Sequence, residues 1–327
     1  MEARKILQVR GMKKYFPVTS GFLKRVTGYV KAVDGVDLYI DQGETLALVG
    51  ESGCGKTTLG RCILRAIPPS AGETVFTKQD GQEVELGTLS YDRLRVVRRD
   101  MQMIFQDPYA SLNPRMTVLN IISEPLQCHR LMSGRAMREY VMELMETVGL
   151  NPRHLERYPH AFSGGQRQRV GIARALATKP RFIVCDEAVS ALDVSVQAQI
   201  LNLLMDLQEQ MGLSYLFISH DLGVVEHISD RVGVMYVGRI VELASTASLF
   251  EKPLHPYTRA LLSAKPVPDP RNKSARIMLE GEVANPADLP TGCAFHPRCP
   301  ACEERCRIEA PEWREVESRH FVACHMR

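Results

Sequence analysis

The stretch that decides the fold is Thr45-Leu-Ala-Leu-Val-Gly-Glu-Ser-Gly-Cys-Gly-Lys-Thr-Thr58. Its first five residues predict a buried strand, and residues 50–57 match the pattern G-x-x-x-x-G-K-[ST]. A helix is predicted over residues 56–66, so the glycine-rich segment joins a strand to a helix. In this setting the pattern indicates a loop whose backbone N–H groups bind phosphate oxygens at the positive end of a helix.

Several residues of this loop have predicted roles in holding a nucleoside triphosphate. Lys56 would reach the β- and γ-phosphates, and the hydroxyl of Thr57 would bind Mg²⁺. Further nucleotide contacts are predicted at Gly50, Ser52, Gly53, Gly55 and Thr58. Cys54 is expected to fill space in the loop, and the alternative is a thiol whose modification blocks nucleotide binding.

A second apolar run, Phe182-Ile-Val-Cys-Asp-Glu187, ends in two carboxylates. Such a strand delivers its last side chains to the C-terminal edge of a parallel sheet, where α/β proteins bind ligands. Asp186 is predicted to hold Mg²⁺, directly or through water, and Glu187 to polarise the attacking water. The alternative is a strand end with solvated acids, and the phosphate loop upstream argues against it.

The composition is that of a globular protein. The chain has 327 residues, of which 45% are hydrophobic and 24% charged, which suits one large or two moderate domains. The formal net charge of +3 is too small to indicate nucleic acid as a partner. No run reaches the roughly 18 apolar residues of a membrane span. The first residues lack the apolar core of a secretory signal, so the cytosol is the expected compartment.

Strands alternate with helices along the chain, which predicts a parallel α/β sheet. A helical insertion is expected near residues 110–165, because Met137, Val141 and Leu144 share one helical face. Proline becomes frequent after Pro253, so we place a domain boundary near residue 250 and expect an irregular tail beyond it.

Five of the nine cysteines lie after residue 292. Four of them, Cys293, Cys299, Cys306 and Cys324, supply the number of thiolates that a zinc site or an iron–sulfur cluster needs, and Cys302 is treated as a spare. In a chain without an expected secretory signal, this clustering favours metal over disulfides. Free buried cysteines are the alternative, and the spacing does not separate zinc from iron.

A glycine-rich segment, Ser163-Gly-Gly-Gln166, opens a predicted helix. Ser163 and Gln166 fit a capping box, and a helix N-terminus with two glycines is also an anion site. The segment lies about twenty residues before the acidic strand, and this arrangement resembles the signature of ABC-transporter ATPases. The phosphate loop and the acidic strand fit the same family.

The resemblance implies roles for residues that carry no signal alone. Gln106 resembles the Q-loop glutamine, which senses Mg²⁺ and the transport subunit, and His220 resembles the switch histidine that contacts the γ-phosphate. Phe16 is similar to the aromatic residue that stacks on adenine, with Tyr15 as the alternative. The segment Ser190-Ala-Leu-Asp193 resembles the D-loop. Many members have proline after the catalytic glutamate, where this chain has Ala188.

The family's architecture is then expected for this chain. It comprises an α/β P-loop NTPase (RecA-like) core, an antiparallel β subdomain and a helical signature subdomain, together covering residues 1–250. Residues 251–327 would form a small, irregular, cysteine-rich C-terminal extension. In the family, each nucleotide lies between two chains, so Ser163, Gly165 and Gln166 would serve the nucleotide of the partner chain.

Four segments narrow the resemblance to the oligopeptide/dipeptide importer branch, and within it to the F-type ATPase subunits of dipeptide permeases. They are Asp107-Pro-Tyr-Ala-Ser-Leu-Asn-Pro-Arg115, Asp193-Val-Ser-Val-Gln-Ala-Gln199, His255-Pro-Tyr-Thr-Arg-Ala-Leu-Leu262 and Gly292-Cys-Ala-Phe-His-Pro-Arg-Cys299. This branch implies a [4Fe–4S] cluster on the four cysteines, with zinc as the alternative.

The same branch implies an ATPase that powers peptide uptake from the cytoplasmic face of the membrane. Its expected partners are a homologous second ATPase subunit, two transmembrane permease subunits and an external solute-binding protein, with no nucleic acid. Nickel, glutathione and oligosaccharide importers share the branch, so the solute class is less firmly implied than the mechanism. The alternatives from other classes are a soluble ABC ATPase that acts on nucleic acid or ribosomes, and a homologue without turnover.

Overall fold

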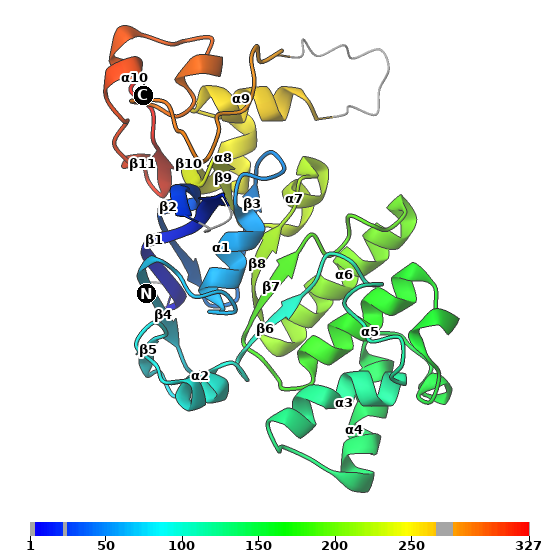
Figure 1. The fold of residues 1–327 in the computed structure, drawn as a ribbon. Coiled ribbons are helices and arrows are strands. Elements are labelled where there is room, and N and C mark those ends of the chain that lie inside the picture. Colours follow the sequence, from blue (N-terminus) through cyan, green and yellow to red (C-terminus); the bar gives the residue numbers. More distant parts are fainter. Residues whose placement is uncertain (1–3, 22–24, 266–276, 327) are drawn as a thin grey trace. The chain divides into compact units, whose positions relative to one another are not determined.

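A computed structural model of the chain describes residues 4–21, 25–265 and 277–326 (Figure 1). The chain divides into two compact units. The first comprises Met1–Ile6, Ile40–Glu44 and Phe76–Ile218, and the second comprises Leu7–Tyr39, Thr45–Val75 and Ser219–Arg327. The phosphate loop therefore belongs to the second unit, and the acidic strand and the signature segment belong to the first.

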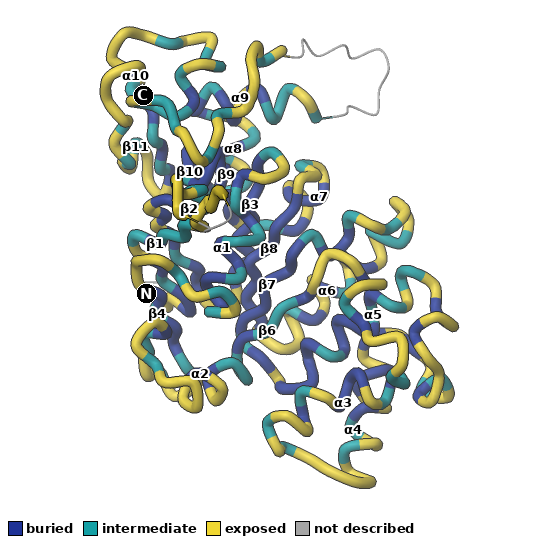
Figure 2. Tube along the Cα trace, in the orientation of Figure 1, coloured by how far each residue is buried: buried dark blue, intermediate teal, exposed yellow. Residues whose placement is uncertain are grey.

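The first unit is built on a parallel sheet with the strand order β8-β7-β6. These strands are β6 (Met101–Ile104), β7 (Phe182–Asp186) and β8 (Ser214–Ile218). In register, Cys185 of the central strand lies opposite Ile104 on one side and Phe217 on the other. Every residue of β7 and β8 is buried (Figure 2), which explains why both read as nearly continuous apolar runs.

Helices α3 and α4 of the first unit lie within the stretch where the sequence predicts a helical insertion, and α3 packs against α4 and α5. Besides its parallel strands, this unit contains β5 (Glu83–Glu85), α2 (Tyr91–Val97), α3 (Val118–Cys128), α4 (Gly134–Thr147), η1 (Pro152–His154), η2 (Pro159–Ala161), α5 (Gly164–Leu176) and α6 (Val194–Met211). In the described part of the chain, no helix has both the length and the apolar character that a membrane span requires.

The second unit contains a mixed sheet with the strand order β3-β9-β10-β12-β11. Its strands are β3 (Thr45–Val49), β9 (Arg231–Tyr236), β10 (Arg239–Ser245), β11 (Arg314–Glu317) and β12 (His320–Val322). The pair β3 and β9 is parallel, and the other neighbouring strands are antiparallel. The buried strand predicted before the phosphate loop is thus present as β3.

The C-terminal tail departs from the irregular segment that the sequence predicts. Strand β12 pairs with β10, with Val322 opposite Glu242 and Phe321 opposite Leu243, and α9 forms directly after Pro253-Leu-His255. Strands of three and four residues are too short to show an alternating pattern in the sequence. Their position is decided by pairing with a strand that lies far away along the chain.

The second unit also carries a separate sheet with β1 between β2 and β4, and several short helices. These elements are β1 (Lys5–Ser20), β2 (Arg25–Asp41), β4 (Ala71–Thr77), α1 (Lys56–Ile63), α7 (Leu222–Ile228), α8 (Thr246–Glu251), α9 (Pro256–Ser263), η3 (His296–Arg298) and α10 (Glu304–Ile308). Strands β1 and β2 are long and uninterrupted, although β1 contains Pro17.

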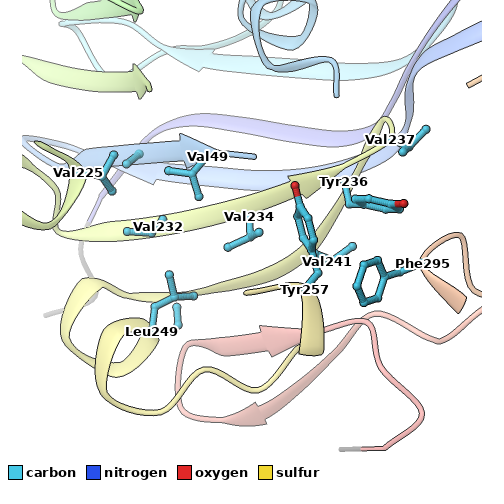
Figure 3. Packing of buried hydrophobic residues seen from close by; sticks show 12 residues of the cluster. Val49, Val225, Val232, Val234, Tyr236, Val237, Val241, Leu249, Tyr257 and Phe295 are labelled. Atoms are coloured by element: carbon cyan, nitrogen blue, oxygen red, sulfur yellow. The ribbon is translucent and has the colours of Figure 1, made fainter. Parts of the chain in front are cut away.

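An aromatic cluster joins the tail to the core of the second unit (Figure 3). Tyr236 of β9, Tyr257 of α9 and Phe295 of the tail are each at most 1% exposed. The ring centroids lie 4.8 Å apart for Tyr236 and Tyr257, and 5.2 Å and 5.4 Å from these rings to Phe295. Burying an aromatic side chain of this kind contributes about 1.5–3 kcal/mol, so Phe295 anchors the tail.

Candidate nucleotide-binding and active site

The phosphate loop lies between β3 and α1, and two of its glycines have no room for a side chain. A Cβ at Gly50 would lie 2.1 Å from the carbonyl oxygen of Met235, and one at Gly55 would lie 2.0 Å from that of Ala32. Both glycines also have positive φ angles, of 150° and 106°. The backbone here turns tightly against neighbouring strands, which leaves its N–H groups for a ligand.

Lys56 is the first residue of α1 and is only 4% exposed. Its ammonium donates to the carbonyl oxygens of Gly50, at 2.8 Å, and Glu51, at 3.0 Å. A buried ammonium needs such partners, because its desolvation would otherwise be very costly. Ser52 and Gly53 are exposed on the loop, and Thr57 and Thr58 are half-buried in the first turn of the helix.

Cys54 lies inside the loop and is 4% exposed. Its Sγ atom is 3.6 Å from the Lys56 ammonium. Burial raises the pKa of the thiol despite this nearby cation. The neutral, enclosed thiol supports the expectation of a space-filling residue over that of a reactive one.

The two carboxylates at the end of β7 differ in their surroundings. Asp186 is the last residue of the strand and is 1% exposed, whereas Glu187 is half-buried and has a positive φ of 47°. Positive φ in a residue other than glycine costs on the order of 1–3 kcal/mol and recurs at functional sites. Here the N–H of Glu187 donates to Ile218 at 3.0 Å, and its carbonyl accepts from the Ser190 hydroxyl at 3.0 Å. These two hydrogen bonds hold the turn in this chain, which has Ala188 where many members of the family have a proline.

Gln106 and Glu187 meet in the first unit. The Nε2 atom of Gln106 donates to Oε2 of Glu187 at 2.8 Å. The two residues follow β6 and β7, which are parallel neighbours, so their side chains emerge at the same edge of the sheet. A glutamine amide in this position can orient the carboxylate, or a water that the carboxylate polarises.

The signature segment caps helix α5. The Ser163 hydroxyl accepts from the N–H of Gln166 at 3.3 Å, and the Gln166 side chain accepts from the N–H of Ser163 at 3.0 Å. The capping box predicted from the sequence is therefore confirmed. A Cβ at Gly165 would lie 2.5 Å from Cγ1 of Val196, so this glycine lets α5 and α6 approach closely.

The second unit carries the remaining candidates, His220 and the adenine-stacking aromatic. His220 is exposed and directly follows Ser219. The Tyr15 hydroxyl donates to Asp34, and burial together with this carboxylate raises the pKa of Tyr15 to about 12. The Phe16 side chain is 37% exposed, and the Lys14 ammonium lies 4.9 Å from the centre of its ring. Phe16 is therefore better suited than Tyr15 to stack on a base.

Two arginines of α5 have roles that the sequence did not reveal. Arg167 lies over the ring of Tyr109 at 3.9 Å, and Arg174 donates to the carbonyl of Ser111 at 2.8 Å. Both contacts hold the segment after Gln106 against the signature helix. In the sequence, the signal for these contacts is the separation of the two arginines by two helical turns.

The tail cysteines are neighbours, but the predicted metal centre is not supported by the structure. Burial, together with the nearby thiols of Cys306, Cys299 and Cys324, raises the pKa of Cys293 to about 11. Among residues 4–21, 25–265 and 277–326, no three or more His, Cys, Asp or Glu side chains are arranged to hold a metal ion. Cys302 is half-exposed and directs its thiol to the carbonyl of Glu303.

Comparison with known families divides the chain into two matched regions. Residues 33–190 match the family described as "ABC transporter". Residues 241–306 match the family described as "Oligopeptide/dipeptide transporter, C-terminal region".

Two curated relatives cover nearly the whole chain. The oligopeptide transport ATP-binding protein AppF of Bacillus subtilis is 54% identical over 324 residues, which are 98% of this chain and 97% of the relative. The di/tripeptide transport ATP-binding protein DppF of Pseudomonas aeruginosa is 49% identical over 320 residues, with 98% and 97% coverage.

A solved structure shares the fold. The ATP-binding cassette MJ0796, in a dimeric post-hydrolysis state bound to ADP and Pi, superposes with a TM-score of 0.63 at 29% identity. The match covers 73% of this chain and 98% of that one. From these matches and the site described above, the chain belongs to the ATP-binding cassette subunits of ABC transporters, in the group with the oligopeptide/dipeptide C-terminal region.

Proposed function

We propose that this protein is the ATP-hydrolysing subunit of an importer for dipeptides or oligopeptides, bound peripherally at the cytoplasmic face of the cell membrane. The observation that carries the proposal is the 54% identity over 98% of the chain to an oligopeptide transport ATP-binding protein. The retained lysine, acidic pair and glutamine of the site support turnover rather than a structural homologue without activity.

Within this function the phosphate loop binds the triphosphate. Lys56 contacts the β- and γ-phosphates, with further contacts from the loop backbone and from Ser52 and Thr58. The hydroxyl of Thr57, the carboxylate of Asp186 and the amide oxygen of Gln106 are the hard oxygen donors that suit Mg²⁺. Bound there, Mg²⁺ would neutralise charge on the phosphates.

Hydrolysis is assigned to Glu187, which accepts a proton from the attacking water while Gln106 orients the carboxylate. His220 contacts the γ-phosphate, and Phe16 stacks on adenine. Ser163, Gly165 and Gln166 complete the donor shell around the nucleotide of a partner chain, so ATP holds two ATPase subunits together until it is hydrolysed.

The partners follow from this role. They are a homologous second ATPase subunit in a heterodimer, two transmembrane permease subunits and, through the complex, an external solute-binding protein. The segment after Gln106, held against α5 by Arg167 and Arg174, is a suitable place to pass motion to the permease.

The test is ATP-driven uptake by proteoliposomes that contain this chain with its membrane partners. The expected result is accumulation of a dipeptide or oligopeptide that depends on ATP and on Glu187. Accumulation of nickel, glutathione or an oligosaccharide instead would show that the importer carries one of the other solutes transported by this branch. An ATPase that is stimulated by DNA or ribosomes and does not sediment with membranes would overturn the proposal.

We also propose that Cys293, Cys299, Cys306 and Cys324 hold a [4Fe–4S] cluster that fixes the tail in place. Mutual proximity of the thiols supports this, and a cluster of four irons takes thiolates that stand further apart than those around one ion. Anaerobically purified protein should be brown and contain iron. A colourless protein with one zinc per chain would show that the site holds zinc and not an iron–sulfur cluster. A metal-free protein in which all nine thiols can be titrated would exclude a metal centre.

A further inference from the structure

Glu51 lies within the phosphate loop, and each of its polar groups has a partner in the second unit. Its N–H donates to the hydroxyl of Tyr257 at 3.0 Å, and its carbonyl accepts from the Lys56 ammonium at 3.0 Å. Its carboxylate accepts two hydrogen bonds from Arg298, at 2.9 Å and 3.1 Å. The loop that binds phosphate is therefore fastened by a side chain of the C-terminal tail, almost 250 residues further along the chain.

The ion pair between Arg298 and Glu51 is not an ordinary surface pair. The Arg298 side chain is 8% exposed and that of Glu51 is 29% exposed. The two N–H groups of the planar guanidinium meet the two carboxylate oxygens in parallel, an arrangement that lysine cannot reproduce. The hydrogen-bonded carboxylate raises the pKa of Arg298 further above its ordinary value. Removal of one partner would leave a largely desolvated charge behind.

The aromatic cluster fixes the position of Arg298. Arg298 ends the short helix η3, and Phe295 at the N-cap of this helix packs edge-on to Tyr236 and at a tilt to Tyr257 (Figure 3). Tyr257 is also the residue whose hydroxyl accepts from Glu51. One rigid cluster thus sets both the arginine and the tyrosine that hold the loop.

The charge of Glu51 gives this contact a consequence for ATP. A carboxylate in a loop that binds a triphosphate repels the ligand, and the repulsion is strong where water is largely excluded. Arg298 neutralises the carboxylate and keeps the Glu51 carbonyl on the Lys56 ammonium. A loop that is held in one conformation before binding also loses less entropy when ATP arrives.

We propose that Arg298 is a positioning residue for ATP, which acts through Glu51 to neutralise and hold the phosphate loop. The proposal rests on the nucleotide site and not on the transported solute. It makes the C-terminal tail a determinant of ATP affinity in this chain, in addition to any role in holding a metal.

The test measures the Kd of the full-length chain for a fluorescent ATP analogue with Mg²⁺ in four forms: wild type, Arg298→Ala, Glu51→Gln and the double variant. Arg298→Ala should weaken binding about tenfold, since it removes one partner of a largely buried charge pair. Glu51→Gln should stay within about threefold of wild type. The double variant should lose much less than the product of the two single effects, because the unpaired carboxylate is gone.

A matched control in the same tail is Arg305→Ala. Arg305 pairs with Glu309 at 2.9 Å, but both side chains are more than half exposed, so the pair contributes little. This variant should bind ATP as wild type does. The single tryptophan of the chain, Trp313, lies in the tail and reports by fluorescence whether each variant remains folded.

Two results overturn the proposal. The first is a folded Arg298→Ala variant whose Kd stays within about twofold of wild type, and the second is a double variant whose loss equals the product of the single losses. If Arg298→Ala does not fold, Arg298→Lys takes its place. Arg298→Lys should then weaken ATP binding when Glu51 is present, but not when it is combined with Glu51→Gln. Equal effects in both backgrounds also overturn it. A wild-type chain that binds no ATP would instead refute the nucleotide site itself.

Discussion

The buried histidine His255 should make the stability of the second unit sensitive to mild acid. His255 is 1% exposed, and it caps α9 by accepting from the N–H of Tyr257 through Nδ1 at 3.0 Å. Burial lowers the pKa of His255 from 6.5 to about 4, although the carboxylate of Glu242 opposes this. The folded protein therefore keeps this ring neutral at a pH where the unfolded chain protonates it.

The sign and size of the effect follow from these two values. Between pH 6.5 and pH 4 the unfolded chain binds more protons at this residue than the folded one, so acid stabilises the unfolded state. The contribution of neutral His255 is complete above pH 6.5 and is lost as the pH falls towards 4. The gap of about 2.5 pH units, at about 1.4 kcal/mol each, amounts to about 3.5 kcal/mol, of which about 2 kcal/mol falls between pH 7 and pH 5.

A variant can remove the titration and keep the cap. His255→Asn retains an acceptor that helix N-caps favour, but it cannot bind a proton in this range. Between pH 7 and pH 5, the free energy of unfolding of wild type should fall by about 2 kcal/mol more than that of His255→Asn. This difference does not depend on which protein is more stable at pH 7. Urea unfolding followed by the fluorescence of Trp313, which stacks on Phe321 at 5.9 Å, gives both free energies of unfolding.

The pH range also separates His255 from its neighbour Glu242. Burial raises the pKa of Glu242, but hydrogen bonds from His320 and from the backbone N–H groups of Leu254 and His255 lower it more, and the net shift is downward. The stability that this depressed pKa supplies is present above its ordinary value of 4.5 and is lost only below it. Parallel stability curves for wild type and His255→Asn between pH 7 and pH 5 would refute the reasoning.

Three further predictions concern catalysis and the tail. Glu187→Gln should bind ATP with unchanged Kd and stop turnover in the assembled complex; turnover within about threefold of wild type would exclude Glu187 as the base. Ser163→Ala should lower the ATPase activity of the complex without changing ATP binding to the isolated chain, whereas a purely capping serine would cost about 1 kcal/mol of stability and leave turnover per folded complex unchanged. If the tail holds the proposed cluster, its removal by a chelator should weaken ATP binding in wild type but not in Arg298→Ala, because Cys299 directly follows Arg298; an equal change in both proteins would show that the cluster does not act through Arg298.

Local motifs were predictable because their physics is local. The glycine positions of the phosphate loop, the capping box of Ser163 and Gln166, and the buried strand β7 depend on residues within a few positions of one another. Their order along the chain was specific enough to identify the family, which the comparisons confirm. The roles of the individual site residues stay predictions.

Other features depend on residues that only the fold brings together. The positive φ of Glu187 is held by a bond to Ile218, and its carboxylate is reached by Gln106, 81 residues earlier. Strand β12 pairs with β10, and β11 pairs in turn with β12, so the tail is more regular than its proline content suggests.

The family, the phosphate loop and the acidic strand could be predicted from residue order alone, since each depends on short motifs with a fixed spacing. The pairing of Arg298 with Glu51, which Phe295 and Tyr257 hold in place, became evident only in the folded chain. An ion pair leaves no pattern in a sequence when its partners are distant along the chain, because any arginine could meet any glutamate. Its strength comes from burial and parallel hydrogen-bond geometry, and both exist only once the chain has folded.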